Sequence, residues 1–483
     1  MSKFDKRERC LFINKLTPPE GLFVGDRTSL HPASHASWRV SPDPFWIPSK
    51  LASELTALGR HLLSFYRACN TLYSQSIRGI QPAWVADYLD RGKPELVVEY
   101  GRMKRFKRAL PMVIRPDIIL TDDGMVITEL DAVPGGIGLT ASLTKNYSQL
   151  CVPLIGGREG MIDSFAAMLK TLSPSDNPTL AIVVSDEAAN YHPEMEWLSN
   201  ELQRKGWIAR VLKPQEVMFT EDRLLMSLNN GQTIPIDILY RFFELFDLKN
   251  IPKSELIFYS AKKERVVMTP SVKSYLEEKM LFAFLFHPTL SRFWITELGE
   301  GTFTLLQRLF PQTWILDPRQ LPPYGVIPDL VVDSRPATDW MDLASASQRG
   351  REFVVKPSGF SPLAWGSRGV AVGHDLPSDE WRATLEHALA SFDQTPHILQ
   401  KFYKGSVFTV EYYDFDHDEI RRMSGRVRLC PYYFVVGEND ARLSGILATI
   451  CPADKKLLHG MSDAVMVPCG IGESILSIQS EKE

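Results

Sequence analysis

A strong hairpin signal constrains the fold more than any other feature of this chain. The strand-like stretches Val113-Ile114 and Ile118-Ile119-Leu120 are followed by Asp122-Asp123-Gly124 and then by Val126-Ile127-Thr128-Glu129. Aspartate and glycine favour tight turns, and the β-branched residues on either side favour strands. The pattern therefore predicts a β-hairpin over residues 109–131.

Three acidic residues lie on the two arms of this predicted hairpin. Asp117 is in the first arm, and Glu129 and Asp131 are in the second. Because side chains alternate along a strand, Glu129 and Asp131 point to the same face. Such carboxylates repel one another unless a cation joins them, and Mg²⁺ prefers oxygen ligands. The hairpin is therefore a candidate magnesium site; a solvated hairpin with surface acids is the alternative.

Further residues around the hairpin suit a phosphate group. Pro134-Gly135-Gly136-Ile137-Gly138 follows the second arm, and glycine backbone can turn sharply and present its N–H groups to an anion. Arg115 stands two positions before Asp117. It is either a salt-bridge partner or the guanidinium that neutralises a transferred phosphoryl group.

A lysine and a small-residue loop form the second chemical segment. Residues 353–356 predict a strand that ends in Lys356, and a loop rich in glycine and serine leads from Ser358-Gly359 to a strand at 369–372. This arrangement predicts a mobile flap that closes over phosphates, and a long hairpin loop is the alternative. It is not a Walker A motif, because no Gly-Lys-Ser/Thr opens a helix.

Two more features suit a nucleotide. A strand is predicted at 397–403, and its backbone at Gln400 and Phe402 offers a donor and an acceptor to an adenine edge. Lys279 lies in a predicted helix over 271–290. It is either a solvated lysine or a second cation for the phosphates.

The middle of the chain predicts a small α/β layer. The apolar run 180–184 is typical of a buried parallel strand, and a helix over 194–205 follows it. Further strands are expected at 208–212 and 236–241. Strand, helix and strand in this order indicate a parallel sheet. Elsewhere we expect irregular structure over 1–48.

Two further helices are expected outside this layer. Residues 49–75 have a helical apolar periodicity, and a helix is predicted at 379–392. From Gly470 onward the chain is polar, and we expect the terminus to fray.

Composition limits the classes of function. A length of 483 residues allows about three domains. The net charge of −4 argues against general binding of nucleic acids, although a local basic groove is compatible with it. Lys104-Arg105-Phe106-Lys107-Arg108 is such a cluster; a solvated face is its ordinary interpretation and a phosphate role the alternative.

Targeting signals and cysteine pairs are not evident. No two of the six cysteines are three positions apart, so no zinc knuckle is expected. The charged start of the chain lacks the apolar core of a signal peptide. The most apolar run, Met280 to Phe286, is too short to span a bilayer. We therefore expect a soluble, cytoplasmic protein without membrane partners.

The two chemical segments together resemble the ATP-grasp superfamily, in the circularly permuted arrangement of glutathionylspermidine-synthase-like proteins. In that family the magnesium hairpin precedes the lysine segments, with Arg-x-Asp followed twelve residues after the Asp by Glu-x-Asn. This chain has Arg115-Pro116-Asp117 and Glu129-Leu130-Asp131 at that spacing. Asp131 departs from the family's Asn, which leaves the metal geometry and catalytic competence open.

The resemblance assigns roles to individual residues. Asp117, Glu129 and Asp131 would ligate Mg²⁺, and Arg115 would face the reacting phosphate. Lys279 and Lys356 match the two family lysines. The expected flap and hinge residues that bind ATP are Ser358, Gly359, Gln400 and Phe402. Arg241, at the end of the middle α/β domain, is the candidate substrate residue.

The resemblance also implies a fold and its division. We expect an α/β (α+β) fold, a circularly permuted ATP-grasp with a small central parallel sheet. The expected units are 1–155, with the helical region and the hairpin; 156–250, the pre-ATP-grasp-like domain; 251–470, with the lysines and flap; and 471–483, a flexible tail.

The function that follows is an ATP- and Mg²⁺-dependent ligase. It would activate a carboxylate as an acyl phosphate for attack by an amine, so both substrates are small molecules. The alternatives are a phosphotransferase that uses the same site and a non-catalytic nucleotide-binding protein. The identities of the acid and the nucleophile, and the oligomeric state, do not follow from the sequence.

Overall fold

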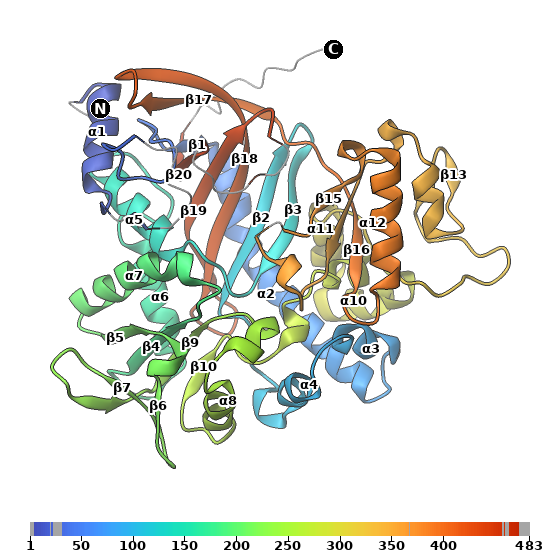
Figure 1. Cartoon of the computed structure of the whole chain (residues 1–483), viewed down its shortest axis with the longest axis horizontal. Coiled ribbons are helices and arrows are strands. Elements are labelled where there is room, and N and C mark those ends of the chain that lie inside the picture. The colour runs from blue at the N-terminus through green and yellow to red at the C-terminus, as the bar shows by residue number, and fades with distance from the viewer. Residues whose placement is uncertain are drawn as a thin grey trace.

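The computed structural model describes residues 4–19, 21–22, 31–366, 368–455, 458 and 463–472. Its largest sheet has the strand order β1-β20-β19-β18-β2-β3, with β17 beside β18 (Figure 1). Its neighbouring strands are antiparallel except β1 and β20. The bounds are β1 (Phe45–Ile47), β2 (Val113–Thr121), β3 (Gly124–Asp131), β17 (Val407–Asp414), β18 (Glu419–Val435), β19 (Ala441–Pro452) and β20 (Val465–Ile471).

The hairpin expected over 109–131 is confirmed by β2 and β3. These strands pair Arg115 with Asp131 and Asp117 with Glu129, and the register shifts by one residue between Asp117 and Ile118. The cross-strand pairing brings the acidic residues of both arms to the same end of the hairpin.

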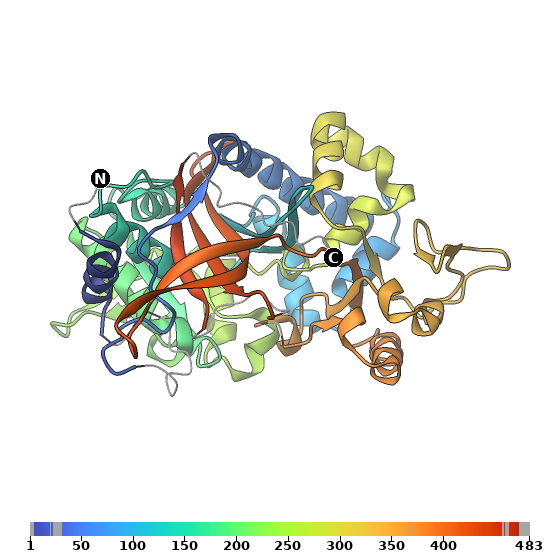
Figure 2. The ribbon, with the colours of Figure 1, turned by 90° about the horizontal axis from the view of Figure 1, so that it is seen from above.

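Helices cover both faces of the central sheet. Tyr433 of β18 donates a hydrogen bond of 2.6 Å to the Leu55 carbonyl of α2 (Ser49–Ile77). Its neighbour Phe434 packs edge-on against Phe165 of α6 (Gly160–Lys170), with ring centroids 5.8 Å apart. Adjacent strand residues point to opposite faces, so α2 and α6 lie on opposite sides of the sheet. The view from above in Figure 2 shows this sheet between helical layers.

A second, four-stranded sheet confirms the predicted α/β layer. Its order is β10-β9-β4-β5, and every neighbouring pair is parallel. In Figure 1 it lies beside the lower part of the central sheet. The bounds are β4 (Thr179–Val184), α7 (His192–Arg204), β5 (Ile208–Leu212), β9 (Ile238–Phe242) and β10 (Val267–Thr269). A small antiparallel sheet is attached, with β6 (Met218–Phe219), β7 (Leu224–Ser227) and β8 (Thr233–Pro235).

The lysine segment forms a third sheet with the order β11-β16-β14-β15. The predicted strands and helix of this region are confirmed, each within a few residues of its expected bounds. The observed bounds are β11 (Thr313–Ile315), β14 (Phe353–Pro357), β15 (Ala371–Val372), α12 (Ser378–Ala390) and β16 (His397–Lys401). A separate two-stranded hairpin joins β12 (Val331–Val332) to β13 (Arg335–Pro336).

The helix predicted over 271–290 is wrong. A 3-10 turn occupies Ser274–Leu276, a turn contains Lys279, and only Leu281–Phe286 is the helix α9. The backbone N–H of Lys279 donates to the Ser358 carbonyl at 2.9 Å, which replaces a helical hydrogen bond. A long-range partner from the residue after β14 therefore outweighs the local apolar periodicity.

The expectation of irregular structure over 1–48 is also wrong in part. Helix α1 spans Lys6–Leu16 and begins with a capping box in which Asp5 and Glu8 bind each other's backbone N–H. The Asp-x-x-Glu signal was therefore present before the Pro- and Ser-rich segment. The predicted frayed tail after Gly470 falls mostly outside the described residues.

The remaining helices pack around these layers. Their bounds are α3 (Trp84–Asp90), α4 (Glu95–Arg102), α5 (Ile137–Ser148), α8 (Ser254–Lys262), α10 (Ser291–Leu298) and α11 (Glu300–Leu309). Among the described residues, none of the helices combines the length and apolar character that crossing a bilayer requires.

Candidate functional site

A cavity of about 550 Å³ lies where the hairpin, the parallel-sheet layer and the lysine segment meet. We call it the central cavity. Its wall includes the predicted residues Arg115, Asp117, Glu129, Asp131, Lys279 and Lys356. The fold therefore brings together the two segments that the sequence placed about 220 positions apart.

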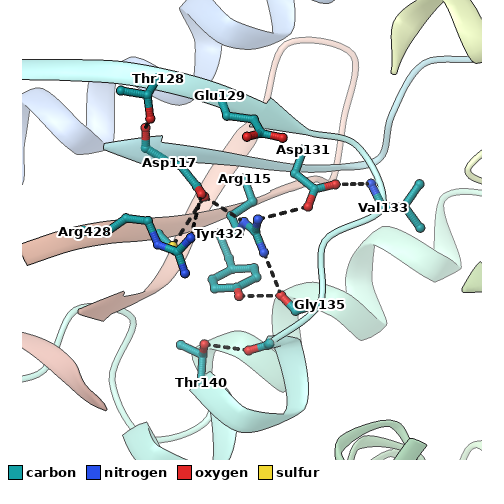
Figure 3. A network of polar contacts seen from close by, with 12 residues as sticks. Arg115, Asp117, Thr128, Glu129, Asp131, Val133, Gly135, Thr140, Arg428 and Tyr432 are labelled. Carbon is teal, nitrogen blue, oxygen red and sulfur yellow. Dashed lines mark hydrogen bonds and ion pairs between the residues drawn. The ribbon is translucent and has the colours of Figure 1, made fainter. Parts of the chain in front are cut away.

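Arg115 occupies the centre of the acidic hairpin (Figure 3). Its Nε lies 3.2 Å from Asp117 Oδ1, and its Nη2 lies 3.0 Å from Asp131 Oδ2. Its Nη1 donates to the Gly135 carbonyl at 3.1 Å. The guanidinium thus holds both arms of the hairpin and the following glycine loop in one arrangement.

Arg428 of β18 is a site residue that the sequence reasoning missed. Its Nη1 lies 3.0 Å from Asp117 Oδ2, so both oxygens of Asp117 face an arginine (Figure 3). Arg428, Cys430 and Tyr432 alternate along β18 and all line the central cavity. A charged residue between the fully buried Val427 and Leu429 was the signal that could have found it.

The two aspartates of the hairpin have opposite pKa shifts. Burial favours the protonated form of Asp117, but Arg428 and Arg115 outweigh it and lower its pKa. At Asp131 burial raises the pKa, Arg115 offsets this only in part, and the nearby Glu129 and Asp117 charges raise it further. Asp117 is therefore held in its charged form by two arginines, whereas the single arginine beside Asp131 does not fully offset the burial of this carboxylate.

Both predicted lysines reach the hairpin. Lys279 Nζ lies 3.0 Å from Glu129 Oε1 and donates to the Ala364 carbonyl at 2.9 Å. Lys356 is 7% exposed, and its Nζ donates to the Thr128 carbonyl at 3.1 Å. Burial lowers the pKa of Lys356 to about 8, with Glu129 acting against this shift and Lys279 adding to it. An anion in the cavity would restore the charged form of this lysine.

The acidic residues fit a divalent cation by chemistry. Asp117, Glu129 and Asp131 supply hard oxygen donors to one cavity wall, which suits Mg²⁺. In the described part of the chain, no group of three or more His, Cys, Asp or Glu side chains is arranged to hold a metal ion as it stands. The carboxylates contact Arg115, Arg428 and Lys279 instead, so a metal would have to take over some of these contacts.

The glycine turn before α5, which the sequence predicted as an anion site, is occupied by a glutamate of the same chain. The backbone N–H groups of Gly136 and Leu139, at the start of α5, donate to Glu194 Oε1 and Oε2 at 2.6 and 2.8 Å. Burial raises the pKa of Glu194 to about 7, although these hydrogen bonds act to lower it. Glu194 was not singled out in the sequence, because a glutamate on an amphipathic helix gives no sign of its buried partners.

The flap residues divide into anchors and cavity-lining residues. Ser358 Oγ donates to Glu278 and accepts from the Met280 N–H at 3.0 Å. At Gly359 a Cβ atom would meet the Glu277 carbonyl at 2.6 Å, so only glycine allows this close approach. Ser358 and Gly359 therefore fasten the start of the loop and do not line the central cavity among the described residues.

The rest of the loop covers the cavity. Arg368 makes an ion pair of 2.7 Å with Glu187 from the segment after β4. Trp365 lies near Tyr191, with ring centroids 6.0 Å apart. Leu363, Ala364 and Gly366 also line the cavity, so the loop closes it on the side of the α/β layer.

The structure does not bring every predicted residue to the cavity. The Gln400 amide, 2% exposed, donates to Thr313 Oγ1 at 3.1 Å, and the Phe402 N–H donates to the Glu352 carbonyl at 2.9 Å. Strand β16 has paired strands on both sides. Neither Gln400 nor Phe402 is among the described residues that line the central cavity.

Arg241 lies directly behind the cavity wall. It is 0% exposed and donates to the carbonyls of Pro270 and Phe243 at 3.2 and 2.6 Å, and it pairs with Glu277. Its neighbours from Phe242 to Glu244 line the cavity, whereas Arg241 does not in the described structure. Its contacts position that segment.

Glu244 is a further residue of the cavity wall that the sequence did not indicate. Within the described residues, its carboxylate makes no hydrogen bond or ion pair, unlike the other carboxylates of the wall. Burial and then the neighbouring Glu277 raise its pKa to about 8, against the effect of Arg241. It is therefore the acidic group of the wall that most lacks a cation.

Comparisons with known proteins support the fold. No protein-family model and no curated protein matches the sequence. The fold is similar to that of a glutathione synthetase-like effector, GSS30, from Globodera pallida in its apo form, with a TM-score of 0.55 and 12% identity over 97% of this chain and 98% of that chain. A "Putative gamma-glutamylcysteine synthetase" from Methylobacillus flagellatus KT gives a TM-score of 0.41 and 12% identity, over 87% of each chain. The chain thus has a mixed α+β fold similar to that of a glutathione synthetase-like protein.

Proposed function

We propose that this protein is an ATP- and Mg²⁺-dependent ligase that activates a carboxylate as an acyl phosphate for attack by an amine. One observation carries the proposal: Lys279, Lys356 and Arg115 line the same cavity as the acidic hairpin. Cations for a triphosphate and oxygen donors for its metal are therefore adjacent. The similarity of fold to a glutathione synthetase-like effector supports a ligase over other classes of ATP-binding protein.

The proposal includes a circularly permuted ATP-grasp arrangement of the glutathionylspermidine-synthase-like kind. The order of the chain supports it, because the hairpin comes before the lysine-bearing segments. We retain the division into units 1–155, 156–250, 251–470 and 471–483 as part of this proposal. Strand β10, at Val267–Thr269, nevertheless joins the sheet of the second unit from beyond residue 250.

The charged residues would overcome the repulsion between a carboxylate and a triphosphate. Lys356, Lys279 and Arg115 would turn from their present partners toward phosphate oxygens, and this would free the carboxylates of the hairpin. Asp117, Glu129 and Asp131 would then hold Mg²⁺, which would neutralise the phosphates of ATP. The raised pKa of Asp131 supports this, since Arg115 offsets the effect of burial on this carboxylate only in part.

The loop over the cavity would protect the activated acid. An acyl phosphate reacts with water, so its site must close before the amine attacks. Trp365 and Arg368 join the loop to Tyr191 and Glu187 across the cavity, which gives it a closed position. Glu244 would face the second substrate: its carboxylate would pair with the ammonium form and accept its proton, which leaves the neutral amine able to attack.

The roles of some predicted ATP-binding residues remain predictions. Ser358 and Gly359 would act by anchoring the loop, and Arg241 by positioning the segment with Glu244. The hinge role of Gln400 and Phe402 requires adenine to reach β16, whose backbone is paired on both sides.

An ADP-release screen across amino acids, peptides and polyamines, with mass spectrometry of the products, tests the proposal. A ligase gives ADP only when an acid and an amine are both present, and its product has their combined mass less one water. ADP formed with an acceptor that lacks an amine would indicate a phosphotransferase. Nucleotide binding by calorimetry without any product would indicate a non-catalytic binding protein.

The metal assignment has its own test. The double variant Asp117→Ala and Glu129→Ala should lose binding of Mg-ATP, measured by isothermal titration calorimetry. The matched control replaces the exposed hairpin-turn residues Asp122 and Asp123 with alanine and should bind as the wild type does. Equal binding by the wild type and the first double variant would show that the metal assignment is wrong.

A further inference from the structure

A second cavity, of about 850 Å³, lies apart from the central cavity and has a different charge pattern. It is bordered by α2, by residues 105–112, by residues 266–271 around β10 and by the end of β18. We call it the α2 pocket. None of the residues assigned to nucleotide, metal or substrate above lines it within the described structure.

One face of a helix forms the longest wall of the α2 pocket. Leu63, Arg67, Asn70 and Ser74 follow one another at steps of three or four residues along α2, and Arg78 is the C-cap residue four positions further on. This spacing places their side chains on the same side of the helix. The helix therefore presents two arginines and an amide to one cavity.

The floor of the α2 pocket is apolar. Buried side chains from different elements contribute to it: Leu63, Phe106, Val266, Met268 and Val435. An apolar floor favours a ligand that has a hydrocarbon or aromatic body.

Of the cations that line the pocket, Arg105 pairs with Glu264 at 2.8 Å, and the others lack carboxylate partners within the described residues. In the described structure Arg67 binds the side-chain oxygen of Asn439 at 2.6 Å, Arg78 binds the Ser74 carbonyl at 3.1 Å, and Lys107 and Arg108 have no side-chain partner. The acidic residue of the wall is Glu438, which is exposed. Positive charge on the rim is therefore in excess and available to an anion.

A buried ammonium behind the wall adds to this positive charge. Lys273 is 2% exposed, and its Nζ donates to Asn70 Oδ1, to the Lys107 carbonyl and to the Ala109 carbonyl at 2.7, 3.1 and 2.8 Å. All three acceptors are neutral groups of pocket-lining residues. Burial lowers the pKa of Lys273 to about 7, so a nearby anion would stabilise its charged form.

We propose that the α2 pocket binds a small amphipathic anion, an apolar molecule that ends in a carboxylate or a phosphate. The apolar body would contact the floor, and the anionic end would lie among Arg67, Lys107 and Arg108. The cavity volume is within the range of small-molecule sites. A fully polar anion would leave the floor unused, and an uncharged apolar molecule would leave the rim unused.

Calorimetry with four probes of matched parts tests this proposal on the full chain. Decanoate and decyl phosphate carry the apolar body with each anionic end. Decyltrimethylammonium has the same body with the opposite charge, and inorganic phosphate has an anionic end without the body. We expect one molecule of decanoate or of decyl phosphate to bind per chain. Comparison of the two titrations shows which anionic end is preferred. The other two probes should bind at least about tenfold more weakly.

Charge reversal then locates the site. Lys107→Glu with Arg108→Glu, both exposed, should weaken the preferred probe at least about tenfold, which is about 1.4 kcal/mol. The control variant Arg382→Glu with Lys404→Glu reverses two exposed cations that do not line the pocket, and its affinity should stay within about twofold of the wild type. Thr71→Trp, which fills the pocket from α2, should also weaken binding. Far-ultraviolet circular dichroism and a thermal melt confirm that each variant is folded.

Several results would overturn the proposal. These are the absence of binding by either anion at about 1 mM, equal binding of decyltrimethylammonium, and unchanged affinity in both pocket variants. Displacement of the probe by Mg-ATP would place it in the central cavity and would also refute the proposal. ATP turnover is not part of the readout, so the result stands independently of the ligase proposal.

Discussion

Cationic side chains line both the central cavity and the α2 pocket, but the two sites differ in whether these cations contact carboxylates. In the central cavity Arg115, Arg428 and Lys279 each contact a carboxylate. In the α2 pocket Arg67, Lys107 and Arg108 contact no carboxylate within the described residues. A paired site holds its side chains in place and must exchange partners when a ligand arrives. An unpaired site offers its charge at once, but solvent and salt screen it.

The largest expected effect concerns Lys356, the lysine of the central cavity whose pKa burial lowers to about 8. Lys356→Gln removes a buried charge that would face the triphosphate, and we expect the rate of ADP release to fall at least about 100-fold. Steady-state kinetics with the best substrate pair measures this. Lys404→Gln, at an exposed position outside the cavity, is the matched control and should keep the wild-type rate. Equal rates of ADP release in both variants would show that Lys356 has no role in the site.

The next effect concerns Glu194, a buried carboxyl group in the wall of the central cavity. Glu194→Ala removes both acceptors of the α5 start, and we expect unfolding free energy to fall by about 2–3 kcal/mol at pH 5. The folded pKa of about 7 is above the ordinary value of 4.5, so the wild type loses stability as pH rises from 4.5 to 7. The difference between variant and wild type should therefore shrink toward pH 8.

Urea unfolding at pH 5, 6.5 and 8 measures this difference. Glu386→Ala, at an exposed position of α12, serves as the control and should show no comparable pH dependence. A difference that grew with pH would contradict the assigned direction of the shift.

Lys273, behind the wall of the α2 pocket, predicts the opposite pH dependence of stability. The folded pKa of Lys273 is about 7, below the ordinary 10.5, so the unfolded chain binds more protons between these values. Wild-type stability should therefore rise with pH above 7, by up to about 1.4 kcal/mol per pH unit from this group. Lys273→Met should lack this rise, and urea unfolding of both proteins at pH 7, 8 and 9 would show it. Parallel curves for the two proteins would mean that Lys273 titrates normally.

The smallest expected effect concerns the ion pair between Arg368 and Glu187, which joins the loop to the α/β layer. Both side chains are partly exposed, so Arg368→Gln should change unfolding free energy by less than about 1 kcal/mol. The KM for ATP should nevertheless rise a few-fold, because the closed loop position is less favoured. A thermal melt and ATP kinetics separate the two effects, and a large loss of stability would show that the pair has a structural role.

Local patterns were enough to predict most elements that carry the site. The Asp-Asp-Gly turn, the apolar run at 180–184 and the strand ending at Lys356 each depend on neighbouring residues, and the structure confirms these elements. The helix predicted over 271–290 does not form because Ser358, directly after β14, accepts hydrogen bonds from the backbone of Lys279 and Met280. A partner 79 positions away from Lys279 leaves no mark on local periodicity.

The hairpin and the lysines of the candidate site could be predicted from the sequence, but the other residues of the cavity wall could not. Arg428, Glu194 and Glu244 reach the cavity through sheet pairing and helix packing, which the sequence does not display. Gln400 could be placed on a strand, but its two-sided pairing depends on which strands become neighbours. Topology, which local patterns do not specify, decided these outcomes.

Strand β18 contributes residues to both the wall of the central cavity and the core of the protein. Arg428, Cys430 and Tyr432 line the central cavity, whereas Tyr433 is bonded to α2 on the reverse side. Deleting a single residue from this stretch would turn the polar side chains toward the apolar core and the packing side chains toward the central cavity. Substitutions along this strand can therefore be tolerated one by one, whereas a change in its length would disrupt the core and the wall of the central cavity together.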